Sequence, residues 1–321
     1  MWSHKWGIGG GWTSSDGVGV GTYHISPAIW GTSGTNIGRI GVICHETGHF
    51  FGLPDLYDGN DSDFDGRAGS GIGSYGMMAN SWGFDGTQYY PPHMCAWSKA
   101  ELGWMSPTVI SNAGTYSLSQ AETSASAYRI DLGYATGEYL LIENRQPVGS
   151  DSVMPQGGLA IFHIDESAST VTEGYPGQSG WPSNGNHYRV ALLQADGTYD
   201  LERGLDRGDR YDVYHQGGVS EISAATTPNT DGYQGGNIVV TNNRIFNISV
   251  SGSTMTFDFE VVGAATPPDA PSNLLATATS YDRIALTWSD QSSDEIGFKL
   301  ERDGGGGWIE IATVGADVLV Y

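Results

Sequence analysis

The chain has 321 residues and carries 14 Lys and Arg against 36 Asp and Glu, so its formal net charge is −22 at pH 7. This charge repels phosphate and excludes nucleic acids and anionic lipid surfaces as the main partner. The hydrophobic fraction of 39% is enough for globular cores, and no run approaches the roughly 18 apolar residues of a membrane span. Two cysteines, Cys44 and Cys95, are too few for a disulfide framework, and the sequence leaves open whether they pair.

Residues 1–110 combine Gly- and Trp-rich loops with two predicted helices. The first covers residues 38–51. Asn36, just before it, is a suitable N-terminal cap, and Gly52, just after it, is a suitable residue to end the helix. The second covers residues 92–102. We treat residues 1–110 as one domain.

Residues 111–263 are predicted to form short β-strands separated by turns. The clearest apolar runs are residues 139–142, 159–164 and 188–193. Residues 238–250 and 254–262 are expected to form a hairpin around Ser251, Gly252 and Ser253. The pattern predicts an antiparallel β-sandwich.

A linker at residues 264–270 precedes a further β-rich segment, residues 271–321. Four strands are predicted there, at residues 272–279, 283–288, 298–302 and 308–314. The pattern is similar to the first half of a fibronectin type III domain, a sandwich that needs about seven strands. We therefore expect a partial domain of that kind.

The sequence HETGHFFGLPD, residues 45–55, carries the clearest chemical signal. Within the first predicted helix, the four-residue spacing places His45 and His49 on one face, where both imidazoles reach one zinc ion. Glu46 is placed to take a proton from a water molecule at the metal. Gly52 permits a sharp turn that brings Asp55 back as the third ligand, because the next glutamate is as distant as Glu101.

Residues 73–79 contain Met77 and Met78 and are a candidate methionine turn beneath the metal. Methionines are otherwise ordinary core residues. Because the zinc motif lies upstream, we favour Met78 as the residue below the site.

These motifs resemble the immune inhibitor A family of secreted bacterial zinc metallopeptidases. The resemblance is carried by residues 41–58 and continues through residues 82–83, 92–93, 96–97, 102–104, 141–145, 158–166 and 193–212. It implies a metzincin-like zincin fold, extracellular cleavage of proteins, calcium-stabilised loops and accessory β-domains. It also implies zinc on His45, His49 and Asp55, with Glu46 as base, and a catalytic domain that begins, with signal and pro-segments, ahead of residue 1.

Two acidic segments are candidate calcium sites, because spaced side-chain oxygens suit a hard cation. The first segment is a loop that is not an EF-hand, and its candidate ligands are Asp58, Asn60, Asp61, Asp63 and Asp65. The second lies between glycines, and its candidates are Asp196, Asp200, Asp206, Asp209 and Asp212. Solvated acidic turns are the alternative for both.

Other residues have a structural and a functional interpretation. His163 and Asp165 share a strand face and suggest a second zinc site, but a structural histidine is favoured because no third ligand follows. Tyr89 or Tyr90 would suit stabilisation of a reaction oxyanion, although aromatic packing is the default.

The sequence thus predicts an α+β protein: a truncated zincin (metzincin-like) catalytic domain, an antiparallel β-sandwich and a partial fibronectin type III-like sandwich. We expect a secreted, monomeric zinc endopeptidase with one catalytic Zn²⁺ and one or two structural Ca²⁺ ions, acting on proteins or peptides. The alternative is an inactive adhesion or carbohydrate-binding protein that keeps a peptidase fold, which exposed tryptophans would favour.

Overall fold

The computed structural model describes residues 3–30, 34–61, 66–263, 269–292, 295, 297–316 and 318–321. The candidate calcium ligands Asp63 and Asp65, and most of the predicted linker, lie outside the described residues. The chain divides into two compact units, Met1–Val262 and Gly263–Tyr321. Residues 1–110 and 111–263 were assigned to separate domains from the sequence, but both lie in the first unit, apart from Gly263.

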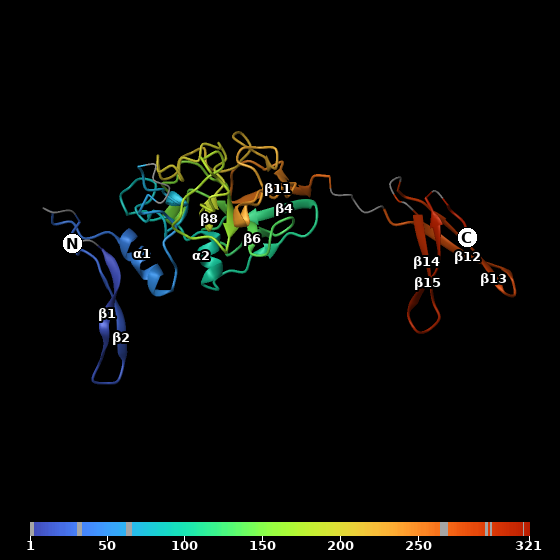
Figure 1. Cartoon of the computed structure of the whole chain (residues 1–321), viewed down its shortest axis with the longest axis horizontal. Coiled ribbons are helices and arrows are strands. Elements are labelled where there is room, and N and C mark those ends of the chain that lie inside the picture. The colour runs from blue at the N-terminus through green and yellow to red at the C-terminus, as the bar shows by residue number, and fades with distance from the viewer. Residues whose placement is uncertain are drawn as a thin grey trace. The chain divides into compact units, whose positions relative to one another are not determined.

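The described part of the chain is sheet-rich, with only two α-helices (Figure 1). The larger sheet of the first unit has the strand order β3-β5-β6-β7-β8 and is antiparallel except for the parallel β3–β5 pair. Its strands are β3 (Thr108–Val109), β5 (Tyr128–Ile130), β6 (Glu138–Arg145), β7 (Gly158–Asp165) and β8 (Val190–Leu192). The smaller sheet has the order β4-β11-β10-β9 and is antiparallel. Its strands are β4 (Gly114–Ser119), β9 (Ile222–Ser223), β10 (Asn243–Phe246) and β11 (Thr254–Val261).

Strands β6, β7 and β8 of the larger sheet are buried at every residue. Because successive side chains of a strand point to opposite sides, both faces of the sheet are covered there. Leu140 and Ile142 of β6 join a hydrophobic cluster with Phe257 of β11, which packs the two sheets together as a sandwich. Tyr139 and Leu141 belong to a second cluster on the opposite face. One sheet therefore serves two cores.

The second core carries the segments that hold the predicted site. It contains Leu53, Leu56 and Met78 from the loops around the zinc motif and Trp97 from helix α2 (Ala96–Glu101). Three short 3₁₀ turns complete the helical elements: η1 (Gly73–Tyr75), η2 (Gly149–Asp151) and η3 (Gln234–Gly236). The site is thus built on loops that pack against a rigid sheet.

Both predicted helices exist but start later than expected. Helix α1 covers Ile40–Phe50, and its N-cap is Arg39 without a side-chain hydrogen bond, so the expected cap at Asn36 is wrong. Helix α2 begins at Ala96, because the preceding backbone is used elsewhere: the N–H of His93 donates to Asp151 Oδ1 at 2.8 Å. The end of α1 at Gly52 agrees with the prediction.

Two further differences concern strands. The Gly-rich N-terminal segment, expected to be loop, forms an antiparallel hairpin of β1 (His4–Thr13) and β2 (Gly19–Ile25), and β1 lies beside α1 (Figure 1). The predicted pairing of β10 with β11 is confirmed, but β10 ends at Phe246, so the connection is longer than three residues.

The second unit contains four strands at the predicted places, paired as two antiparallel hairpins, β12–β13 and β14–β15. Trp288 is buried and packs edge-on against Phe298, with ring centroids 5.4 Å apart. The strands are β12 (Ser272–Ser280), β13 (Arg283–Ser289), β14 (Gly297–Asp303) and β15 (Trp308–Gly315). In neither unit does a described helix have the length and apolar character required to cross a membrane.

Candidate metal centre

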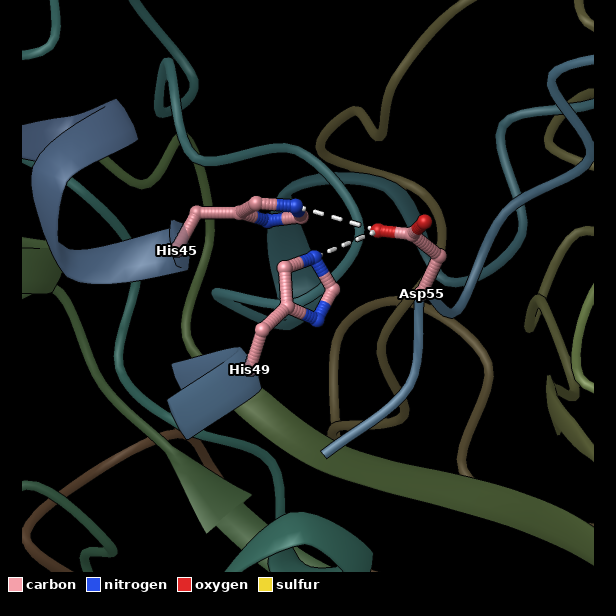
Figure 2. A group of neighbouring side chains, drawn as sticks. All are labelled: His45, His49 and Asp55. Carbon is pink, nitrogen blue, oxygen red and sulfur yellow. Dashed lines mark ion pairs between the residues drawn. The ribbon is translucent and has the colours of Figure 1, made fainter. Parts of the chain in front are cut away.

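His45 and His49 project from one side of α1 toward the carboxylate of Asp55 (Figure 2). Their ring centroids are 4.8 Å apart, as expected for residues four positions apart on a helix. Nε2 of His45 lies 3.0 Å from Asp55 Oδ1, and Nε2 of His49 lies 3.4 Å from the same oxygen. The three predicted zinc ligands therefore converge.

The end of α1 explains how Asp55 reaches the histidines. Gly52 has a φ of 93°, a left-handed conformation that glycine adopts at little cost. The N–H of Gly52 donates to the carbonyl of His49, and the N–H of Leu53 donates to the carbonyl of Gly48. These are the two bonds of a Schellman motif. The chain therefore reverses after the helix and returns Asp55 to the face that it has just left.

The second nitrogen of each imidazole is fixed by a backbone carbonyl. Nδ1 of His45 lies 3.0 Å from the carbonyl oxygen of Met77, and Nδ1 of His49 lies 2.8 Å from that of Leu53. Because a carbonyl only accepts hydrogen bonds, each Nδ1 carries a proton, and a neutral ring turns the lone pair of Nε2 toward Asp55.

This donor set fits a divalent metal. Two nitrogen lone pairs and a carboxylate oxygen repel one another unless positive charge lies among them, and two protonated imidazoles this close would also repel. Two histidines and one carboxylate, with carbonyls orienting the histidines, are a common arrangement at catalytic zinc. His45, His49 and Asp55 would hold the ion, with a position left for substrate or water.

The electrostatics of the three residues are coupled. Burial raises the pKa of Asp55, but the adjacent imidazoles, which donate to Asp55 Oδ1 whenever Nε2 is also protonated, outweigh that effect and hold its pKa well below the usual range. The hydrogen bond that protonated Nε2 of His49 donates to Asp55 raises the pKa of His49, although burial acts against it. Asp55 is therefore a charged carboxylate at neutral pH, as a metal ligand must be.

Glu46 and Tyr57 border the same centre. Glu46 is buried, and its charge contributes to the raised pKa of His49. The ring of Tyr57 lies 6.4 Å from that of His45, centroid to centroid, and burial together with the charges of Asp55 and Glu46 raises the pKa of its hydroxyl. Tyr57 was not predicted as a site residue, although its position two residues after Asp55 indicates that it lies close to the centre.

Tyr89 and Tyr90 were the sequence candidates for an oxyanion-stabilising residue. Both are exposed, and Tyr89 instead stacks on Arg39, whose Cζ lies 4.1 Å from its ring centroid. Tyr57 is the tyrosine that lies beside the candidate metal ligand His45.

Met78 is fully buried against α1. A Cβ atom added to Gly48 would overlap its sulfur, so the methionine side chain occupies the space that glycine leaves on the helix. The carbonyl of Met78 accepts a hydrogen bond of 3.0 Å from the N–H of Leu56. The residue thus contacts both segments that carry the candidate metal ligands.

A buried ion network supports the Met77–Met78 turn. Nη1 of Arg145 donates to the carbonyl of Tyr75 at 2.6 Å, and the guanidinium forms ion pairs with Asp151, Glu143 and Glu122. Burial raises the pKa of Glu122 to about 7, and the negative charge of Asp151 adds to this effect, although the backbone N–H of Gln146 and the positive charge of Arg145 oppose it.

The second acidic segment forms a partial cluster. The carboxylate oxygens of Asp196, Asp209 and Asp212 lie within 4.8 Å of one another. Burial raises the pKa of Asp212 to about 7, and the charges of its neighbours add to this, against a hydrogen bond from the N–H of Asp209. Glu202, which the sequence analysis did not select, is buried nearby, and burial raises its pKa to about 8.

Two residues of that segment do not join the three. Asp200 forms an ion pair with Arg203 at 3.4 Å, and Asp206 accepts a hydrogen bond of 3.0 Å from the N–H of Gly208.

The first acidic loop shows no such gathering in its described residues. Asp58 is fully buried and accepts a hydrogen bond of 2.7 Å from the N–H of Asn60, and Asp61 accepts one of 3.2 Å from Gly66. Neither Asp58 nor Asp61 belongs to a group of three candidate metal ligands in the described part of the chain.

His163 and Asp165 belong to two separate buried pairs. Nε2 of His163 lies 3.0 Å from Glu138, and Asp165 lies 2.8 Å from Nε2 of His187. Among the described residues they form no three-ligand group, which supports a structural role. Cys44 and Cys95 are both free thiols, so the pairing left open by the sequence does not occur.

Comparison with models of protein families, with curated proteins and with solved structures found no match to this chain.

Proposed function

We propose that this protein is a secreted zinc-dependent endopeptidase of the immune inhibitor A type, with a metzincin-like catalytic fold. The observation that carries the proposal is the convergence of His45, His49 and Asp55, with both histidines oriented by carbonyls. The position of Met78 beneath α1 supports the metzincin-like part.

Zinc, when bound, polarises the scissile carbonyl and lowers the pKa of water to about 7. The chain's own residues supply the rest. The carboxylate of Glu46 accepts a proton from the attacking water and delivers it to the nitrogen of the departing amine. The hydroxyl of Tyr57 donates a hydrogen bond to the carbonyl oxygen of the substrate as negative charge develops there.

An inactive adhesion or carbohydrate-binding protein is the second candidate. Exposed tryptophans favour it: Trp6 and Trp12 on the β1–β2 hairpin are 68% and 58% exposed, and Trp308 in the second unit is 72% exposed. Aromatic faces of this kind suit sugar rings or a partner protein. The buried carboxylate of Glu46 beside three metal ligands has no use in that role, so we prefer the enzyme.

The test compares the full chain with Glu46→Ala and with Glu101→Ala, a control at an exposed position on α2. Bound zinc is measured by elemental analysis, and cleavage is measured on casein and gelatin. We expect about one zinc per chain in all three proteins and cleavage by the parent and Glu101→Ala only. A zinc-loaded parent that cleaves no faster than Glu46→Ala would contradict the proposal.

A further inference from the structure

A cavity of about 360 Å³ lies beside the first turn of α1. It is lined by Asn36, Ile37, Gly38, Arg39, Ile40, Gln88 and Tyr89. Arg39 is the only charged residue in this lining.

The guanidinium of Arg39 is held in place by uncharged groups. It lies between the rings of Trp30 and Tyr89, with Cζ 4.1 Å from each ring centroid. Its Nη1 donates a hydrogen bond to the carbonyl of Thr87. Stacking on two aromatic faces restricts the plane of the guanidinium, so its remaining N–H groups are preorganised.

The positive charge of Arg39 is not neutralised within the cavity. Its Nε atom is buried and finds no hydrogen-bond acceptor among the described residues, and the lining contains no acidic residue. Other arginines of this acidic chain, Arg145 and Arg244 among them, pair with carboxylates. Buried donors are normally hydrogen-bonded, so an unpartnered one indicates that a ligand binds here. A carboxylate fits best, because its two oxygens accept two parallel N–H bonds from a guanidinium.

The cavity is close to the metal centre along the helix. Arg39 immediately precedes α1, and His45 lies six residues further on, which corresponds to about 9 Å along the helix axis and about 120° around it at about 1.5 Å and 100° per residue. An extended peptide advances about 3.3 Å per residue. A substrate that runs from the metal centre along α1 toward its first turn would therefore reach the cavity about three or more residues from the scissile bond.

We infer that the Arg39 cavity binds a carboxylate of the substrate and selects peptides that carry one at this distance. The inference rests on the proposed peptidase function. The carboxylate comes either from an acidic side chain or from the carboxyl terminus of a peptide, and the two sources share this chemistry.

The experiment uses acetylated, amidated peptides in which one Glu is moved stepwise through a neutral sequence, each matched to a peptide with Gln at that place. A second series replaces the terminal amide by a free carboxylate at the same distances. We expect kcat/KM to be about tenfold higher for Glu than for Gln at one position, as for a hydrogen bond to a charged group. A preference for the free terminus alone would assign the cavity to terminal carboxylates.

Three variants test the role of the arginine. Arg39→Gln should bring the Glu/Gln ratio close to one, and Arg39→Glu should reverse the preference toward Lys at that position. Arg210→Gln is the matched control, because Arg210 lines another cavity and lies over Tyr211, and it should keep the parent ratio. A reversal of preference does not arise from a merely structural role.

Equilibrium binding of the same peptides to the Glu46→Ala chain, measured by calorimetry, separates this inference from the proposed function. If Glu46-dependent cleavage occurs without a preference for Glu or for a free carboxyl terminus at any position, or if the preference survives Arg39→Gln, the cavity assignment is wrong. If cleavage is absent, but Glu peptides bind more tightly than Gln peptides and Arg39→Gln removes the difference, the cavity assignment is supported and the peptidase proposal is contradicted.

Discussion

Nδ1 of His45 lies 3.0 Å from the carbonyl oxygen of Met77, and this contact turns Nε2 of the imidazole toward Asp55. The next carbonyl, that of Met78, accepts the N–H of Leu56, directly after Asp55. Two consecutive carbonyls of one turn therefore hold the helix ligand and the loop ligand. The geometry of the centre depends on how this turn packs under α1.

Gly48→Ala tests that packing. At an exposed helix position, replacing Gly by Ala stabilises by about 1 kcal/mol. At Gly48 the new methyl would overlap the sulfur of Met78, so we expect a loss of about 1 to 3 kcal/mol from overpacking. Displacement of the turn should also weaken zinc binding. Urea unfolding and chelator competition measure the two effects.

Thr47→Ala is the control for Gly48→Ala, because Thr47 is exposed on the same helix. It should leave zinc affinity unchanged. Equal or greater stability of Gly48→Ala, with unaltered zinc affinity, would show that Met78 does not support the centre.

Asp55→Ala removes the only anion among the proposed ligands. We expect zinc affinity to fall by at least about 100-fold, more than the loss of an orienting group causes. Asp85→Ala serves as control, since Asp85 is exposed and bonds only to its neighbour Thr87 among the described residues. Competition with a fluorescent zinc chelator measures both, and the ligand assignment would fail if the two variants bound zinc equally well.

Much of the centre could be predicted because it is local. The spacing of His45 and His49 and the turn at Gly52 depend on neighbouring residues, and the structure places both as the sequence indicated. The carbonyl of Met77 and the ring of Tyr57 were not predicted as contacts of His45. Such contacts depend on tertiary packing, which leaves no regular spacing in the sequence.

The same distinction applies to the fold. Strands β6 and β7 were recognised because each contains an apolar run, residues 139–142 and 159–162, as is typical of strands that are buried on both faces. The β1–β2 hairpin was missed because its strands are rich in glycine and largely exposed, so they lack the alternation that marks a strand. Helix α2 is shorter than predicted because Asp151, distant in sequence, binds the backbone at His93.

Asp212→Asn tests calcium binding by the cluster of Asp196, Asp209 and Asp212. Three close carboxylates repel one another without a cation, so the neutral isostere should raise the melting temperature in EGTA. In millimolar calcium the parent should be the more stable protein, because it keeps a charged ligand. Thermal unfolding in both buffers gives the comparison, and calcium binding here is contradicted if calcium leaves the parent unchanged.

Glu122→Gln tests the buried network behind the Met77–Met78 turn. The pKa of Glu122 is raised from an ordinary 4.5 to about 7, so the folded protein holds the proton more tightly than the unfolded chain. Its contribution to the free energy of unfolding is therefore largest below about pH 4.5 and decreases as the pH rises toward 7.

Glutamine at position 122 does not ionise and retains an oxygen that accepts the hydrogen bond from the N–H of Gln146, while Arg145 keeps its ion pairs with Asp151 and Glu143. We expect the free energy of unfolding of the variant to rise relative to that of the parent between pH 5 and pH 8, by about 1 to 3 kcal/mol in total. Urea unfolding across this pH range measures the change. The control is Glu101→Gln at an exposed position of α2, whose stability difference from the parent should not vary with pH. A constant difference between variant and parent would mean that Glu122 is ionised throughout.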